Sequence, residues 1–183
     1  MYAVLGCSLV LLFAAQANAT GICPAVGVAT DCGVQINVGA GNALTITNGP
    51  AGNNNPYDGV EDTLVGVTNN SGATINSISL TSTTNAFFFD GDGACSFMGG
   101  GGCGATGYEG PNVTFNTAGV DGAGNGTLVV NFTGGLSDGS SLWFSLEGSP
   151  SSIITGGSTP EPASLVLLGT GLLGLGILVR RSA

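Results

Sequence analysis

Short segments in which apolar residues alternate with small polar ones recur along the chain, separated by turns rich in glycine and asparagine. Side chains of a β-strand point alternately to opposite faces, so this pattern predicts strands with one buried face. We expect strands at residues 34–38, 44–47, 63–68, 75–80, 113–115, 128–132 and 142–146, with a shorter candidate at 87–89. No segment before residue 160 has the period of a helix. The chain is therefore predicted to be all-β.

The spacing of these segments favours a single antiparallel β-sandwich, Ig-like or jelly-roll-like, over residues 20–148. The segment Asn69-Asn70-Ser71-Gly72 separates two predicted strands and is expected to close a β-hairpin. Residues 149–159 consist mainly of Ser, Gly, Thr and Pro. Such a composition is typical of a linker.

The only basic residues of the sequence are Arg180 and Arg181, against eleven acidic residues and no histidine. Phosphate binding relies on Lys and Arg, so the composition argues against a nucleic-acid partner. Anionic lipid surfaces would repel the domain for the same reason. Catalytic systems that need His or Lys beside a nucleophile are excluded as well. Cations, neutral glycans and protein surfaces remain as partners.

Of the five cysteines, Cys7 lies in the N-terminal apolar run and the other four are Cys23, Cys32, Cys95 and Cys103. In an exported protein, an even number of closely spaced cysteines predicts disulfides. We expect local pairing, Cys23 with Cys32 and Cys95 with Cys103; four free buried thiols are the alternative. Zinc is disfavoured, because the sequence has no His and no Cys-x-x-Cys pair.

The N-terminal segment has the pattern of a signal peptide over residues 1–19. The apolar run at residues 4–15 is too short for a comfortable membrane span, and Ala17-Asn18-Ala19 supplies a small-x-small site for cleavage before Thr20. No basic residue precedes the run, so we expect translation to start upstream of Met1. A lipoprotein signal at Cys7 is the alternative, disfavoured because the apolar run continues past that residue.

At the other end, Pro160-Glu161-Pro162 precedes an apolar run at residues 163–179, and Arg180 and Arg181 follow the run. A helix over this run would be roughly 25 Å long, which is workable for a bilayer core. The arginine pair is expected on the cytoplasmic side, which leaves the β domain outside. The alternative is a plain C-terminal membrane anchor.

This tail resembles the PEP-CTERM sorting signal, which combines a Pro-Glu-Pro motif, a transmembrane helix and a basic cluster. Residues 57–63, 89–93, 107–111 and 143–147 also resemble a domain common among PEP-CTERM proteins. The resemblance implies a Gram-negative host that makes exopolysaccharide, and cleavage by an exosortase, a membrane-embedded cysteine protease. After transient anchoring in the inner membrane, the mature protein would lose its helix and reach the cell surface or the medium.

With His and Lys absent and the cysteines expected in disulfides, carboxylates are the groups that remain to build a functional site. The candidate Ca²⁺ ligands are Asp58, Glu61, Asp62, Asp90 and Asp92, provided that the fold brings their loops together. The alternative is that the Asp-Gly pairs only form turns. Tyr57 and Tyr108 flank these acidic segments, where they could contact a glycan or pack against the domain.

We therefore expect a non-enzymatic surface or extracellular-matrix protein, sorted by an exosortase and linked to exopolysaccharide or biofilm. One alternative is a module that binds a glycan or another surface protein, with Ca²⁺ as a potential cofactor. A more distant alternative is a glycoside hydrolase that uses two carboxylates at a defined separation. The carboxylates available for that role are Asp58, Glu61, Asp62, Asp90, Asp92 and Glu109.

Overall fold

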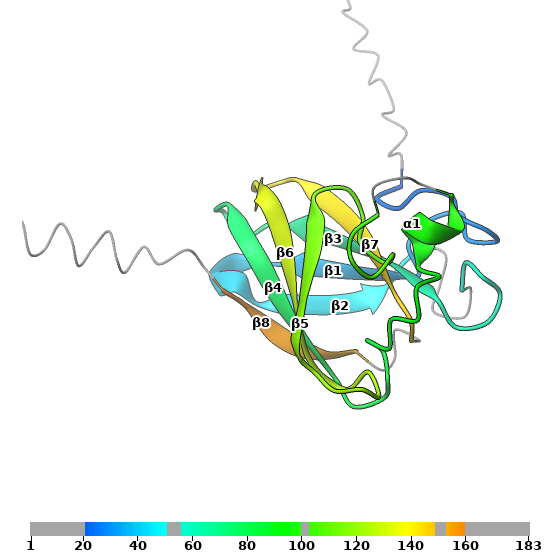
Figure 1. Ribbon diagram of the computed structural model, residues 1–183. Coiled ribbons are helices and arrows are strands. Elements are labelled where there is room, and N and C mark those ends of the chain that lie inside the picture. Colours follow the sequence, from blue (N-terminus) through cyan, green and yellow to red (C-terminus); the bar gives the residue numbers. More distant parts are fainter. Residues whose placement is uncertain (1–20, 51–55, 100–102, 149–152, 160–183) are drawn as a thin grey trace, which may run out of the picture.

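Two four-stranded β-sheets form the framework of the protein in this computed structural model (Figure 1). The structure describes residues 21–50, 56–99, 103–148 and 153–159. The first sheet has the order β2-β1-β3-β7 and the second the order β5-β6-β4-β8. The strands are β1 (Val34–Val38), β2 (Leu44–Asn48), β3 (Thr63–Asn69), β4 (Ile75–Ser82), β5 (Val113–Val120), β6 (Gly126–Leu136), β7 (Ser141–Leu146) and β8 (Ile153–Thr159). The all-β prediction is confirmed.

One hydrophobic cluster draws its side chains from both sheets. Alternate residues of the strands contribute to it, as the two-residue period of the sequence predicts. The first sheet supplies Val34, Ile36, Val38, Val65, Val67, Phe144 and Leu146, and the second supplies Ile75, Ile78, Leu80, Val113, Leu128, Val130, Phe132 and Leu136. Each buried side chain of this size stabilises the fold by about 1.5–3 kcal/mol.

A second cluster covers the opposite face of the β3–β7 pair. Leu64 of β3 is buried there beside Tyr57, and Trp143 of β7 packs against the same cluster half-buried. The covering segments are the loops that precede β1 and β3, together with the short helix α1 (Ala94–Phe97). Figure 1 shows α1 on the β3–β7 side of the molecule, away from β8. These loops hold most of the acidic residues that the sequence singled out.

Two expectations about strand pairing are wrong. The first sheet is not purely antiparallel, because β1 and β3 pair in parallel, with Val34 opposite Val65. The segment at residues 69–72 does not close a hairpin either, since β3 and β4 belong to different sheets. The buried Asn69 links the two sides of this crossing, because its Nδ2 donates to the carbonyl oxygens of Ala73 and Leu136, each at 2.7 Å.

Two further segments differ from their predictions. Residues 87–89 form no strand; Phe87 is buried in the core while Phe88 is exposed. Residues 153–159, expected within a linker, form β8 against the edge of β4. The β-branched residues Ile153, Ile154 and Thr155 favour a strand, and β4 would otherwise expose an unpaired edge.

The expected processing segments lie outside the described residues. They are the signal peptide at residues 1–19 with its cleavage site at Ala17, Ala19 and Thr20, and the sorting residues Pro160, Glu161, Pro162, Arg180 and Arg181. The expected membrane helix at residues 163–179 is also outside them. Within the described ranges, no helix has both the length and the apolar character needed to span a membrane.

Candidate functional site

Two carboxylates lie at one end of the β3–β7 ladder. Thr63 pairs with Leu146 in that antiparallel ladder, so the adjacent outer positions are those of Asp62 and Glu147. Both side chains are buried, Asp62 at 1% exposure and Glu147 at 8%. Like charges at opposed positions of a ladder destabilise a sheet. This end of the ladder therefore needs a compensating group.

The hydroxyl of Tyr108 lies at the centre of the acidic cluster, which we define as Asp62, Asp90, Asp92 and Glu147. Its oxygen is 3.4 Å from Asp62 Oδ1, 3.0 Å from Asp90 Oδ1 and 2.6 Å from Asp92 Oδ1, and it also contacts Glu147 Oε2. A phenol has one hydrogen to donate. At most one of these four carboxylates can receive it as a full hydrogen bond.

The loop that carries Asp90 and Asp92 is held against β7 by Ser145. The Ser145 Oγ accepts a hydrogen bond from the Ala94 amide (3.0 Å) and donates one to the Tyr108 carbonyl (3.2 Å), while the Ser145 amide donates to the same carbonyl (2.8 Å). Asp90 and Asp92 are themselves exposed. The cluster thus has a buried side, formed by Asp62 and Glu147, and a solvent side.

Burial dominates the electrostatics of the buried side. It raises the pKa of Asp62 to about 7, with the charges of Asp92 and Glu147 acting in the same direction. Burial also raises the pKa of Glu147 and that of Tyr108. On the solvent side, the interaction between the two aspartates lowers the pKa of Asp90 and raises that of Asp92. Without a counter-ion, the cluster therefore favours retained protons over four negative charges.

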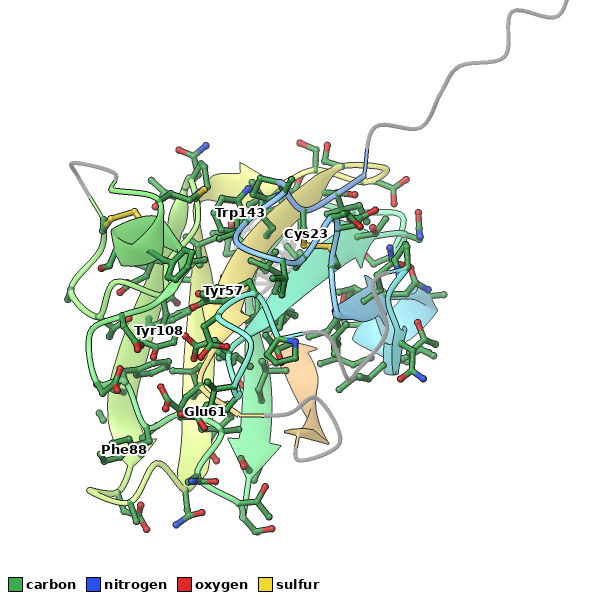
Figure 2. All side chains as sticks on the ribbon, turned by 90° about the vertical axis from the view of Figure 1, so that its right-hand side faces the viewer. Cys23, Tyr57, Glu61, Phe88, Tyr108 and Trp143 are labelled. Carbon is green, nitrogen blue, oxygen red and sulfur yellow. A yellow bond between two sulfur atoms is a disulfide. The ribbon has the colours of Figure 1, made fainter. Side chains whose placement is uncertain are left out.

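Two buried polar atoms beside the cluster, Asp62 Oδ2 and the hydroxyl of Tyr57, form no hydrogen bond of good geometry. The two side chains nevertheless lie close enough to interact, and the Tyr57 hydroxyl acts to lower the pKa of Asp62. Tyr57 is 1% exposed, and burial is the main cause that raises its pKa, followed by the proximity of Asp62. Figure 2 shows Tyr57 and Tyr108 on the same side of the molecule as Glu61. A buried polar atom without a partner is costly and calls for an explanation.

The structure brings together three of the five predicted Ca²⁺ ligands: Asp62, Asp90 and Asp92. Asp58 does not join them as a ligand, because its Oδ1 accepts hydrogen bonds from the amides of Val60, Glu61 and Asp62 and so shapes the loop. Glu61 is exposed beside the cluster.

Glu147 was missed by sequence reasoning. Its signal was its place directly after a predicted strand, just as Asp62 directly precedes one. Only the pairing of β3 with β7 makes these two positions neighbours, and that pairing is not visible in the sequence.

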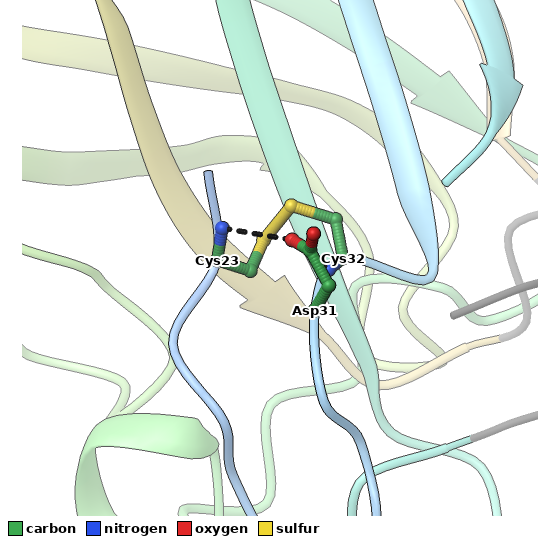
Figure 3. A group of neighbouring side chains, drawn as sticks. All are labelled: Cys23, Asp31 and Cys32. Carbon is green, nitrogen blue, oxygen red and sulfur yellow. Dashed lines mark hydrogen bonds between the residues drawn. A yellow bond between two sulfur atoms is a disulfide. The ribbon is translucent and has the colours of Figure 1, made fainter. Parts of the chain in front are cut away.

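A second group of potential metal ligands consists of Cys23, Asp31 and Cys32. Its two sulfurs are already joined in a disulfide, with an S–S distance of 2.06 Å, and the other predicted bond joins Cys95 and Cys103 at 2.05 Å. Asp31 Oδ1 accepts hydrogen bonds from the amides of Cys23 (3.2 Å) and Cys32 (2.7 Å), the first of which Figure 3 shows. This group is therefore a structural clasp, and the expected local pairing is confirmed.

The acidic cluster offers oxygen ligands of the type that hard cations prefer. One carboxylate oxygen from each of Asp62, Asp92 and Glu147 lies within 4.8 Å of the other two. A glycoside hydrolase would instead need two carboxylates open to a sugar. Both Asp62 and Glu147 are buried, as are the rings of Tyr57 and Tyr108. The geometry therefore suits an ion better than a glycan.

Comparison with known proteins identifies the tail rather than the β-sheets. The family model of the PEP-CTERM protein-sorting motif matches residues 158–182. The match includes the Pro-Glu-Pro sequence, the apolar run and both arginines. No curated protein and no solved structure matches the chain.

Proposed function

We propose that the β domain of this chain works without catalysis at the cell surface or in the extracellular matrix. The premise is the PEP-CTERM sorting motif, which marks the chain as an exported, envelope-targeted protein that an exosortase processes. The observation that carries the proposal is the motif match at residues 158–182. We further propose that the two sheets form a β-sandwich of the jelly-roll or Ig-like kind. The domain would be linked to exopolysaccharide or biofilm.

The two processing segments support this route. We propose that residues 1–19 direct export and that residues 163–179 hold the chain transiently in the inner membrane until it is cleaved. The matched motif begins at residue 158, within the last residues of β8. Cleavage near Pro160 would therefore leave the new C-terminus at the end of an edge strand. Only a few residues would then separate the domain from any surface component to which it is linked.

The composition and the site support a role without catalysis. Histidine and lysine are absent from the sequence. Of the acidic cluster, Asp62 and Glu147 are buried.

Two disulfides in a chain of this size suit an oxidising compartment. The formal net charge of −9 favours solubility and keeps the domain away from anionic surfaces.

Replacement of the sorting motif tests the proposal. In a host with its exosortase, the variant with Pro160, Glu161 and Pro162 all changed to Ala should remain in the inner-membrane fraction, whereas the native chain reaches the surface or the medium. The matched control changes Ser149, Pro150 and Ser151 to Ala. Equal release of the motif variant and the native chain would contradict the proposal.

A second candidate is a glycan- or protein-binding module, favoured by a hollow beside β7. The hollow has a volume of about 480 Å³ and is lined in part by Met98, Pro111, Thr114 and Trp143. Concave surfaces that combine apolar and aromatic side chains are typical of ligand sites. If it binds exopolysaccharide, Thr114→Arg should reduce retention on beads of that polymer, while Thr45→Arg on exposed β2 should not. Equal retention of both variants would contradict this candidate.

A further inference from the structure

We propose that Asp62, Asp92 and Glu147 bind a Ca²⁺ ion at the end of the β3–β7 ladder, with Asp90 at the solvent side of the same site. The ion would supply the positive charge that the acidic cluster lacks. The proposal goes beyond the sorting route, because exosortase processing does not depend on it.

The separation of the carboxylates fits this ion. Ca²⁺ binds oxygen atoms at 2.3–2.6 Å, so two ligands on opposite sides of one ion are roughly 5 Å apart at most. Oxygen atoms of the three carboxylates lie within 4.8 Å of one another. They come from three separate segments: the residue before β3, the loop before α1 and the residue after β7.

The unpartnered oxygen of Asp62 is an independent indication of a ligand. Asp62 is 1% exposed, its Oδ1 is 3.4 Å from the Tyr108 hydroxyl, and its Oδ2 has no hydrogen-bond partner. A fully buried carboxylate oxygen without a donor costs the free energy of its desolvation. An ion between Asp62 and Glu147 would supply the missing interaction.

Within the described part of the chain, no side chain can provide the positive charge. The only basic residues of the sequence are Arg180 and Arg181, which lie in the matched sorting motif. The Tyr108 hydroxyl brings one hydrogen to four carboxylates. A buried charge without a partner is expensive. A cation from solution is therefore the natural counter-charge.

The donor set favours Ca²⁺ among the common cations. The cluster presents only oxygen atoms, and the four cysteines of the described residues are paired in disulfides. Zinc prefers nitrogen and sulfur. Mg²⁺ demands a small, regular octahedral shell, whereas Ca²⁺ accepts irregular sets of six to eight oxygen atoms. Sites of extracellular modules bind Ca²⁺ with a Kd of about 10⁻⁴–10⁻³ M.

A bound ion would tie together the loops that cover the outer face of the first sheet. Asp62 belongs to the loop that carries Tyr57, and Asp92 belongs to the loop that leads to α1. Both loops would then be fixed to β7 through Glu147. The domain would gain this stabilisation outside the cytoplasm, where calcium is abundant.

The test uses the full chain in mild detergent, depleted with EDTA and then titrated with CaCl₂ by calorimetry and in thermal unfolding. Native protein should bind Ca²⁺, and its melting temperature should rise by about 3–8 °C at saturation. Asp62→Asn and Asp92→Asn should each weaken binding about tenfold or more. The matched control is Asp138→Asn, which changes an exposed aspartate whose Oδ1 accepts a hydrogen bond from the Gly72 amide. This variant should bind Ca²⁺ as the native chain does.

Asp92→Asn keeps the test decisive if Asp62→Asn fails to fold, because Asp92 is exposed. NaCl at equal ionic strength separates binding from the screening of the net negative charge. No heat of binding and no thermal shift at millimolar CaCl₂ would overturn the proposal. An equal shift with NaCl or MgCl₂, or an equal loss in Asp138→Asn, would overturn it as well.

Discussion

Asp62 and Glu147 occupy adjacent outer positions of the β3–β7 ladder, one step beyond the Thr63–Leu146 pair, and both are buried. A strand end normally places such carboxylates in water. Here the loops that carry Tyr57 and Tyr108 cover them. The raised pKa values of both carboxylates follow from this burial.

Neutralising one of the two carboxylates should have opposite effects with and without calcium. In EDTA at pH 8, Glu147→Gln should stabilise the domain by about 0.2–1 kcal/mol, because it removes one of two opposed like charges. In saturating CaCl₂ the same variant should be less stable than the native chain, since it lacks a ligand. Thermal unfolding in the two buffers measures this crossover. The prediction fails if Glu147→Gln shifts stability in the same direction in both.

The crossing between the sheets should depend on Asn69. Asn69→Ala removes the side-chain donor from the buried carbonyl of Leu136 and should cost about 1–3 kcal/mol in urea unfolding. Asn70→Ala changes the exposed neighbour and should cost less than about 0.5 kcal/mol. Similar costs for both variants would show that the Asn69 side chain does not stabilise the crossing.

The strands themselves were largely predictable, because alternation is a local pattern. The choice of partners was not, since it depends on residues far apart in the chain. The parallel pairing of β1 with β3 and the passage from β3 to β4 across the sheets are both of this kind. The same limit explains the site: Asp62, Asp90 and Asp92 could be listed as candidates, but Glu147 becomes a member only through the β3–β7 register.

The two disulfides should differ in their effect on stability. Loops of this length, with sequence separations of 9 and 8, are each expected to contribute about 2–3 kcal/mol through the unfolded chain. Replacing Cys23 and Cys32 by Ser should cost more than replacing Cys95 and Cys103, because the first pair is buried and would leave two hydroxyls in an apolar cluster. Urea unfolding of the two double variants makes the comparison. Equal costs would argue against a clasp role for the first pair.

The turn at residues 121–125 should loosen in acid. Asp121 Oδ1 accepts hydrogen bonds from the amides of Asn125 and Ala123, each at 2.9 Å, and these bonds lower the pKa of Asp121. A lowered folded-state pKa means that this stabilisation is present above the ordinary aspartate pKa, roughly 4, and is lost as the pH falls through the folded value. Amide hydrogen exchange at Ala123 and Asn125 should therefore show less protection in strong acid. Asp121→Asn, which keeps the acceptor but does not titrate, should remove this pH dependence.

The intact mass of the protein, from strains with and without the exosortase, tests the central account most directly. With the enzyme present, we predict a mature chain that begins at Thr20, ends near Pro160 to Pro162 and lacks the two hydrogens that each disulfide removes. Without the enzyme, residues 163–183 should remain on the chain. If those residues are retained in both strains, the tail is a permanent anchor and the sorting account is contradicted.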